Sequence, residues 1–117
     1  MFEKDVIAET LHEAGRAYLR ALGDDYLPAW HDAPRWMQEA MLELVDYLID
    51  NPVAPAHAAH DYWRQGMLAR GWRVGEARDW LVRRDPNMVP WDELSEVGRR
   101  RAVLLHNVFF ALVVAEV

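Results

Sequence analysis

Aromatic rings and guanidinium groups are concentrated in one stretch of the chain, residues 60–94. Four of the six tryptophans and six of the thirteen basic residues fall within these 35 positions. Indole rings stack on planar groups, and arginine binds phosphate or carboxylate through a planar pair of hydrogen bonds. The combination is typical of a site for a planar, anionic ligand. The same composition also fits tryptophans buried in a core with arginines on its solvated rim.

Nucleophilic catalysis and phosphate-binding loops have little support in the sequence. The only serine, Ser95, and the only threonine, Thr10, stand where helix capping or a helix surface explains them, and neither lies in a nucleophile-elbow pattern. The chain has no cysteine, which excludes disulfides and thiolate chemistry. Gly66, Gly71 and Gly75 do not form a Walker or dinucleotide-binding pattern. We therefore expect no enzymatic activity.

His57 and His60, followed by Asp61, are the best candidates for a metal site. Their spacing places both imidazoles on one face of a helix. A third ligand would have to come from a distant residue such as His12 or Glu13, and structural metal sites usually have more ligands at closer spacing. Adjacent helical residues diverge by about 100°, so His12–Glu13 and His60–Asp61 are not ready-made acid–base pairs. We expect neither a metal nor a cofactor.

The length and composition indicate one globular domain, residues 1–117. Apolar residues make up 52% of the chain and charged residues 27%. Residues 1–69 carry 5 basic and 12 acidic groups, a net charge of −7, whereas residues 70–117 carry 8 and 7, a net charge of +1. Broad nucleic-acid binding needs a large basic surface, so we expect none. Charged residues interrupt any apolar run near the N-terminus, which favours a cytoplasmic location.

Apolar residues with helical spacing predict a mainly α fold of four principal helices. The first three are expected at about residues 3–22, 34–50 and 56–70. Gly23 and Gly71 should end the first and third helices, because glycine readily adopts the left-handed conformation. Asp32 can cap the second helix, with Pro34 in its first turn.

Residues 72–91 have no regular period and are interrupted by Gly75, Pro86 and Pro90. We predict a structured loop with two short β-strands, at about residues 72–74 and 88–90. An irregular segment of this length inside a small domain is more often functional than idle.

The last helix should begin at Ser95 and continue to about residue 116. Its apolar residues extend nearly all round, so it is either central to the core or half of a homodimer interface. We favour the core; in a homodimer, Phe109, Phe110 or Val113 would make the contact. The apolar run is too short and too polar to span a membrane.

Two sets of residues match a known pattern. The first set is His60, Trp63, Gly71-Trp72, Gly75, Arg78-Asp79, Pro86, Val89-Pro90-Trp91 and Leu94. The second, in the N-terminal half (about residues 3–51), is His12-Glu13, Arg16, Tyr18, Gly23-Asp24, Pro28, Trp30, Ala33-Pro34 and Trp36. With both, the chain from about Ile7 to Leu112 resembles the ryanodine receptor repeat (RyR) domain in its stand-alone bacteriophage and bacterial form. The resemblance implies a mainly helical fold with short strands, no established catalytic activity, and binding of nucleotide-derived signals.

The sequence departs from the family at five positions. The family usually has tyrosine, proline, lysine, histidine and an acidic residue where this chain has Val74, Glu76, Val82, Asp85 and Ala102. Most of these changes remove or reverse polar groups, and a carboxylate repels phosphate. The resemblance therefore transfers the scaffold better than it transfers the identity of a ligand.

We expect a non-enzymatic module, encoded by a phage and present in the host cytoplasm, that binds a nucleotide-type anion. The expected ligand-binding residues are His12, Arg16, His60, Trp63, Trp72, Arg78, Arg83 and Arg84. The alternative is a protein-interaction module that docks on a host or phage protein. A ligand module needs a concave pocket, and an interaction module needs an exposed apolar patch. In either case Trp63, Trp72 and Trp91 should gather at one edge of the core.

Overall fold

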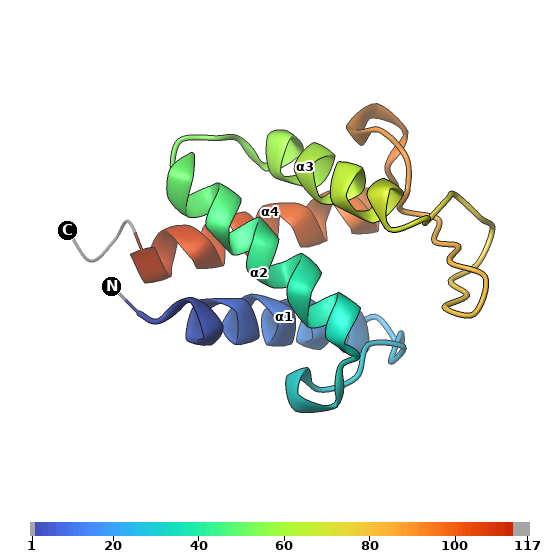
Figure 1. Ribbon diagram of the computed structural model, residues 1–117, viewed down its shortest axis with the longest axis horizontal. Coiled ribbons are helices and arrows are strands. Elements are labelled where there is room, and N and C mark those ends of the chain that lie inside the picture. Colours follow the sequence, from blue (N-terminus) through green and yellow to red (C-terminus); the bar gives the residue numbers. More distant parts are fainter. Residues whose placement is uncertain (1, 114–117) are drawn as a thin grey trace.

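Four helices form the fold, and the computed structural model describes residues 2–113 (Figure 1). They are α1 (Lys4–Ala21), α2 (Arg35–Asp50), α3 (Ala56–Ala69) and α4 (Glu96–Val113), with short 3-10 turns η1 (Trp30–Asp32) and η2 (Trp91–Glu93). α1 and α3 each pack against both α2 and α4. The fully buried side chains between them include Ile7, Leu11, Val45 and Phe109. The predicted mainly α fold with four helices is confirmed.

The N-terminal ends of α4 and α2 are capped differently. Ser95 precedes α4 as predicted, and its Oγ accepts a hydrogen bond of 3.1 Å from the backbone N–H of Gly98. Before α2 the prediction was wrong, because Pro34 rather than Asp32 is the N-cap residue. Asp32 is instead the last residue of η1, where its backbone already bonds within the 3-10 turn. The predicted end of α4 at residue 116 lies outside the described residues.

The loop between α3 and α4 contains backbone bridges instead of the two predicted strands. Arg84 pairs with both Arg73 and Asp79 as isolated bridges, and no strand occurs within residues 2–113. The prediction for residues 72–74 therefore found a real pairing position at Arg73. The prediction for residues 88–90 was wrong, since Pro90 within that stretch has no backbone N–H and the N–H of Met88 bonds locally to the carbonyl oxygen of Asp85.

α4 contributes to the core in the way the sequence favoured. Phe109 is fully buried, and Phe110 and Val113 are partly buried against the same cluster. Val103 and Val97 are exposed elsewhere on the helix. None of the helices in the described part of the chain is long and apolar enough to cross a membrane.

The two helix pairs repeat one structural unit. α1 and α3 align with a shift of 48 positions, which places His60 on His12 and Gly71 on Gly23. The two glycines have φ of +90° and +85°. After each glycine, the next backbone N–H donates to a carbonyl five residues earlier, so both helices end in the same way. α2 and α4, together with the 3-10 turns before them, align with a shift of 61 positions.

A histidine bridges helix and turn at the same place in both units. His12 Nε2 lies 2.7 Å from the carbonyl oxygen of Pro28. His60 Nε2 lies 2.8 Å from the carbonyl oxygen of Val89. The histidine and its carbonyl are 16 residues apart in the first unit and 29 in the second, so the second unit carries 13 additional residues. We call residues 73–87, which replace residues 25–26 of the first unit, the insertion loop; it extends beyond the helices in Figure 1.

Candidate functional site

A cleft of about 310 Å³ lies where the insertion loop meets the start of α2 and the end of α3. We call it the tryptophan–arginine cleft, and its lining residues are Trp36, Arg70, Trp72, Trp80 and Arg83. The ring centroids of Trp36 and Trp72 are 4.9 Å apart, and those of Trp36 and Trp80 are 5.7 Å apart with an interplanar angle of 88°. Trp72 is only 3% exposed, whereas Trp80 is 38% exposed. The cleft therefore has a fixed indole floor and one accessible indole wall.

The two arginines of the cleft differ in their charge balance. Arg70 forms an ion pair with Glu43 and donates to the carbonyl oxygen of Gly66. Arg83 donates to the carbonyl oxygen of Arg70, but none of the described carboxylates lies within 4 Å of its guanidinium group. Arg83 thus gives the cleft one positive charge that is not neutralised. It also has φ of +56°, which no other non-glycine residue in the described chain shares. This left-handed conformation costs on the order of 1 kcal/mol, and such strain concentrates at functional sites.

Backbone hydrogen bonds fix the turn that carries Trp80 and Arg83. Asp79 and Arg84, which flank this turn, exchange hydrogen bonds of 2.8 and 2.9 Å between their backbone groups. The carbonyl oxygen of Arg83 accepts a further bond of 3.0 Å from the backbone N–H of Arg73. The backbone positions of Trp80 and Arg83 are therefore set by the same closed turn.

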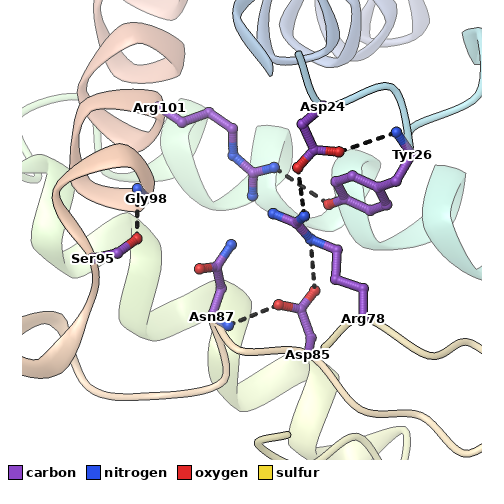
Figure 2. Close-up of polar contacts among 8 residues, drawn as sticks. All are labelled: Asp24, Tyr26, Arg78, Asp85, Asn87, Ser95, Gly98 and Arg101. Carbon is purple, nitrogen blue, oxygen red and sulfur yellow. Dashed lines mark hydrogen bonds and ion pairs between the residues drawn. The ribbon is translucent and has the colours of Figure 1, made fainter. Parts of the chain in front are cut away.

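Arg78 connects the insertion loop to the first unit (Figure 2). Its Nη1 lies 2.7 Å from Asp24 Oδ2, and its guanidinium carbon lies 3.8 Å from the centre of the Tyr26 ring. Its Nε is 4.0 Å from Asp85 Oδ2, and the other oxygen of Asp85 accepts a bond of 2.7 Å from the backbone N–H of Asn87. Arg78 is therefore occupied by internal partners, and it positions the loop instead of facing a ligand.

Three other predicted site residues also make structural contacts. His12 and His60 bridge helix and turn in their respective units, and they line two adjacent cavities of about 80 and 90 Å³ that share Met41, Trp63, Arg101 and Leu105. Arg16 donates from Nε to the carbonyl oxygen of Leu27 at 3.2 Å and from Nη1 to Glu13 at 3.1 Å. Neither Arg16 nor Arg78 lines either cavity.

Glu13 has the clearest electrostatic perturbation in the first unit. Its Oε1 accepts a hydrogen bond of 2.9 Å from the backbone N–H of Trp30, and its Oε2 pairs with Arg16. The hydrogen bond from Trp30, reinforced by the charge of Arg16, holds the pKa of the Glu13 carboxyl below its ordinary value. The charged carboxylate therefore stabilises the connection between α1 and η1.

The predicted tryptophan cluster forms in part. Trp63 packs against the buried group that contains Trp72, but Trp91 is not part of that group. The ring centroid of His60 is 5.7 Å from that of Trp63 and 6.0 Å from that of Trp91. Arg84 is exposed and donates to carbonyl oxygens of its own loop. Of the eight predicted residues, only Trp72 and Arg83 line the tryptophan–arginine cleft.

Sequence reasoning missed three residues of the cleft, Trp36, Arg70 and Trp80. Arg70 and Trp80 lie inside the aromatic and arginine-rich stretch, but nothing in their spacing separates them from its other members. Trp36 is in α2, and only tertiary packing places it beside Trp72. Trp36 was among the residues that carry the family resemblance, but that match did not indicate that it lines a cleft.

Several apolar side chains of the insertion loop are exposed, among charged ones such as Arg73, Glu76 and Asp79. Leu81 is 96% exposed, Val82 is 57% exposed and Val74 is 55% exposed, next to the accessible ring of Trp80. Consecutive exposed apolar side chains on one loop are unusual for a surface that contacts only water.

Among residues 2–113, no three histidine, aspartate or glutamate side chains form a group that could hold a metal ion. Comparisons with protein-family models, curated proteins and solved structures find no match to this chain. The function proposed below therefore rests on the geometry of the tryptophan–arginine cleft.

Proposed function

We propose that the protein is a non-enzymatic binding module whose tryptophan–arginine cleft takes a planar anion of the nucleotide type. One observation supports this most strongly: Arg83, in a strained conformation and without a carboxylate partner among the described residues, lies in a cleft with three indole rings. A base stacks on the accessible face of Trp80 against the floor of Trp72. The phosphate accepts charge-assisted hydrogen bonds from Arg83.

The size and charge of the cleft limit the ligand. Its volume of about 310 Å³ is at the lower end of the range that is typical of small-molecule sites. Its net charge is close to one positive unit, because Glu43 neutralises Arg70. These properties favour a nucleotide with a single phosphate group over a triphosphate, whose additional charges would find no partner.

Titration with AMP, followed by tryptophan fluorescence and by calorimetry, tests the proposal. Trp80→Ala should weaken binding by about 5- to 150-fold, because stacking of a base on an aromatic side chain contributes about 1–3 kcal/mol. Arg83→Gln should weaken it by a similar factor and make the remaining affinity less sensitive to salt. Arg84→Gln is the matched control: it removes an exposed neighbouring arginine and should leave the affinity unchanged. Equal binding by Arg83→Gln and the wild type would refute the proposal.

The exposed apolar side chains of the insertion loop support protein interaction as a second candidate function. Leu81, Val82 and Val74 form the kind of surface that a partner protein would cover. A photo-crosslinking side chain at position 81 should then give one discrete protein adduct in cells that express the protein. The same group at Val53, which is 91% exposed in the linker between α2 and α3, should give none. Identical adduct patterns at the two positions would count against this function.

A further inference from the structure

The two internal cavities are equivalent in the repeated unit, but their polar groups are not. Seven residues of one cavity align with seven of the other through the same shifts of 48 and 61 positions. At one aligned position the first unit has Ala40 and the second has Arg101, whose side chain lines both cavities. The cavity of about 90 Å³, which we call the α4 cavity, also contains Asn87 from the insertion loop. The second unit therefore has two polar side chains at this cavity, whose other lining residues are apolar except for His60 and His106.

These two side chains have hydrogen-bonding capacity that the described residues do not use. Arg101 makes one long contact, 3.5 Å from Nη1 to the hydroxyl oxygen of Tyr26, and no described carboxylate lies within 4 Å of it. Asn87 is 9% exposed, yet its side-chain amide makes no hydrogen bond with any residue from 2 to 113. The two side chains approach the same space from α4 and from the insertion loop (Figure 2). Arg101 is partly buried, whereas Asn87 is buried, and a buried side-chain amide normally has a hydrogen-bond partner.

The rest of the α4 cavity is mostly aliphatic. Its walls include Met41, Leu44, Ala102 and Leu105. The cavity thus combines Arg101 and Asn87 with mainly apolar walls, and the two histidines of the lining, His60 and His106, already contact backbone carbonyl oxygens through Nε2. A carboxylate with a short aliphatic chain has the complementary shape and chemistry: its oxygens accept from Arg101 and Asn87, and its chain replaces water against the walls.

We propose that the α4 cavity is a binding site for a short-chain aliphatic carboxylate. Inorganic phosphate is disfavoured there, because most of its oxygens would be desolvated against aliphatic walls without a hydrogen-bond donor. The site is separate from the tryptophan–arginine cleft, so it stands whether or not that cleft binds a nucleotide.

Titrations of the full-length protein with sodium acetate, propionate and butyrate at constant ionic strength test this assignment. Chemical shifts of the Arg101 guanidinium and Asn87 amide groups report occupancy. The affinity should rise about fourfold with each methylene, as expected for burial of that group. 1-Butanol and inorganic phosphate should not produce the same shifts. Equal affinity for acetate and butyrate, or no binding of either, would overturn the proposal.

Variants of α4 separate the site from general effects of salt. Arg101→Met keeps the packing of the side-chain stem but removes the charge, and it should reduce butyrate affinity at least tenfold. Arg100→Met is the matched control, because Arg100 is exposed on the same helix and pairs with Glu96 at 2.6 Å. If Arg101→Met does not fold, butyrate binding by Ala102→Leu is the deciding measurement, because the larger side chain fills the cavity and leaves the charge of Arg101 in place. Undiminished butyrate binding by Ala102→Leu would place the ligand elsewhere and overturn the proposal.

Discussion

The internal repeat predicts that lengthening one side chain will stabilise the protein. In the first unit Glu13 accepts a hydrogen bond from the backbone N–H of Trp30 and an ion pair from Arg16. The aligned residue in the second unit is Asp61, one methylene shorter, which makes neither contact with a described residue. The Nε of Arg64, which aligns with Arg16, is buried without a hydrogen-bond partner. Asp61→Glu should supply a carboxylate to the backbone N–H of Trp91, which aligns with Trp30, and to the guanidinium group of Arg64.

The magnitude follows from the contacts of Glu13. A hydrogen bond to a charged group contributes about 1.5–3 kcal/mol, and a partly exposed ion pair adds about 0.2–1 kcal/mol. Ordering the longer side chain costs up to about 1 kcal/mol, and the site is partly solvated. We therefore expect Asp61→Glu to raise the free energy of unfolding by about 1–2 kcal/mol. For a domain of this size, that gain corresponds to an increase in Tm of about 4–8 °C.

Urea denaturation and calorimetry of Asp61→Glu and Glu13→Asp give the test. Glu13→Asp shortens the carboxylate in the first unit and should lower stability by a similar amount. Asp61→Gln separates the two contributions, because its amide oxygen can accept from the backbone but cannot form the ion pair. If Asp61→Glu leaves the midpoint unchanged while Glu13→Asp lowers it, the two units are not equivalent at this position. That result would refute the reasoning.

Two further predictions concern the polar contacts of Arg78 and Glu13. Arg78→Gln should destabilise the protein by about 1–2 kcal/mol, since Arg78 is 23% exposed and its pairing with Asp24 is only partly screened. Amide hydrogen exchange at Arg73 and Arg84 should accelerate, while exchange in α2 should not change. A uniform increase in exchange would argue against a local anchor. Glu13→Gln should remove a pH-dependent part of the stability: a carboxyl whose pKa is lowered in the folded state stabilises the protein above its ordinary pKa, and this contribution is lost as pH falls through the folded-state value. The difference between Glu13→Gln and the wild type in urea should therefore be largest near pH 7 and shrink below about pH 4.5, whereas a constant difference would exclude this origin.

The sequence was sufficient for the helices because their signals are local. Apolar spacing located all four, and Gly71 and Ser95 marked a helix end and a helix start where the structure has them. The error at Asp32 arose because a 3-10 turn and a helix N-cap favour the same residue types. The bridges of Arg84 could not be foreseen, since pairing between loop segments depends on register that no periodic pattern records.

The candidate site was only partly predictable, for a different reason. Aromatic and arginine composition located Trp72 and Arg83, but composition cannot show which charges are already paired. Arg78 was expected to face a ligand, and its carboxylate partner Asp24 is 54 residues away in the sequence. Trp36 reaches the cleft only through the packing of α2. Tertiary partners of this kind decide whether an arginine binds a ligand or fixes a loop.

The repeat also indicates which part of the protein carries its specific function. Features that occur in both units, such as the bridges made by His12 and His60, serve the scaffold, because the unit needs them wherever it occurs. The insertion loop has no counterpart in the first unit, and it supplies Trp80 and Arg83 to the cleft. It also supplies the amide of Asn87 to the α4 cavity. Both proposed sites are therefore built where the two units differ, and deletion of the loop should remove both while leaving the four helices folded.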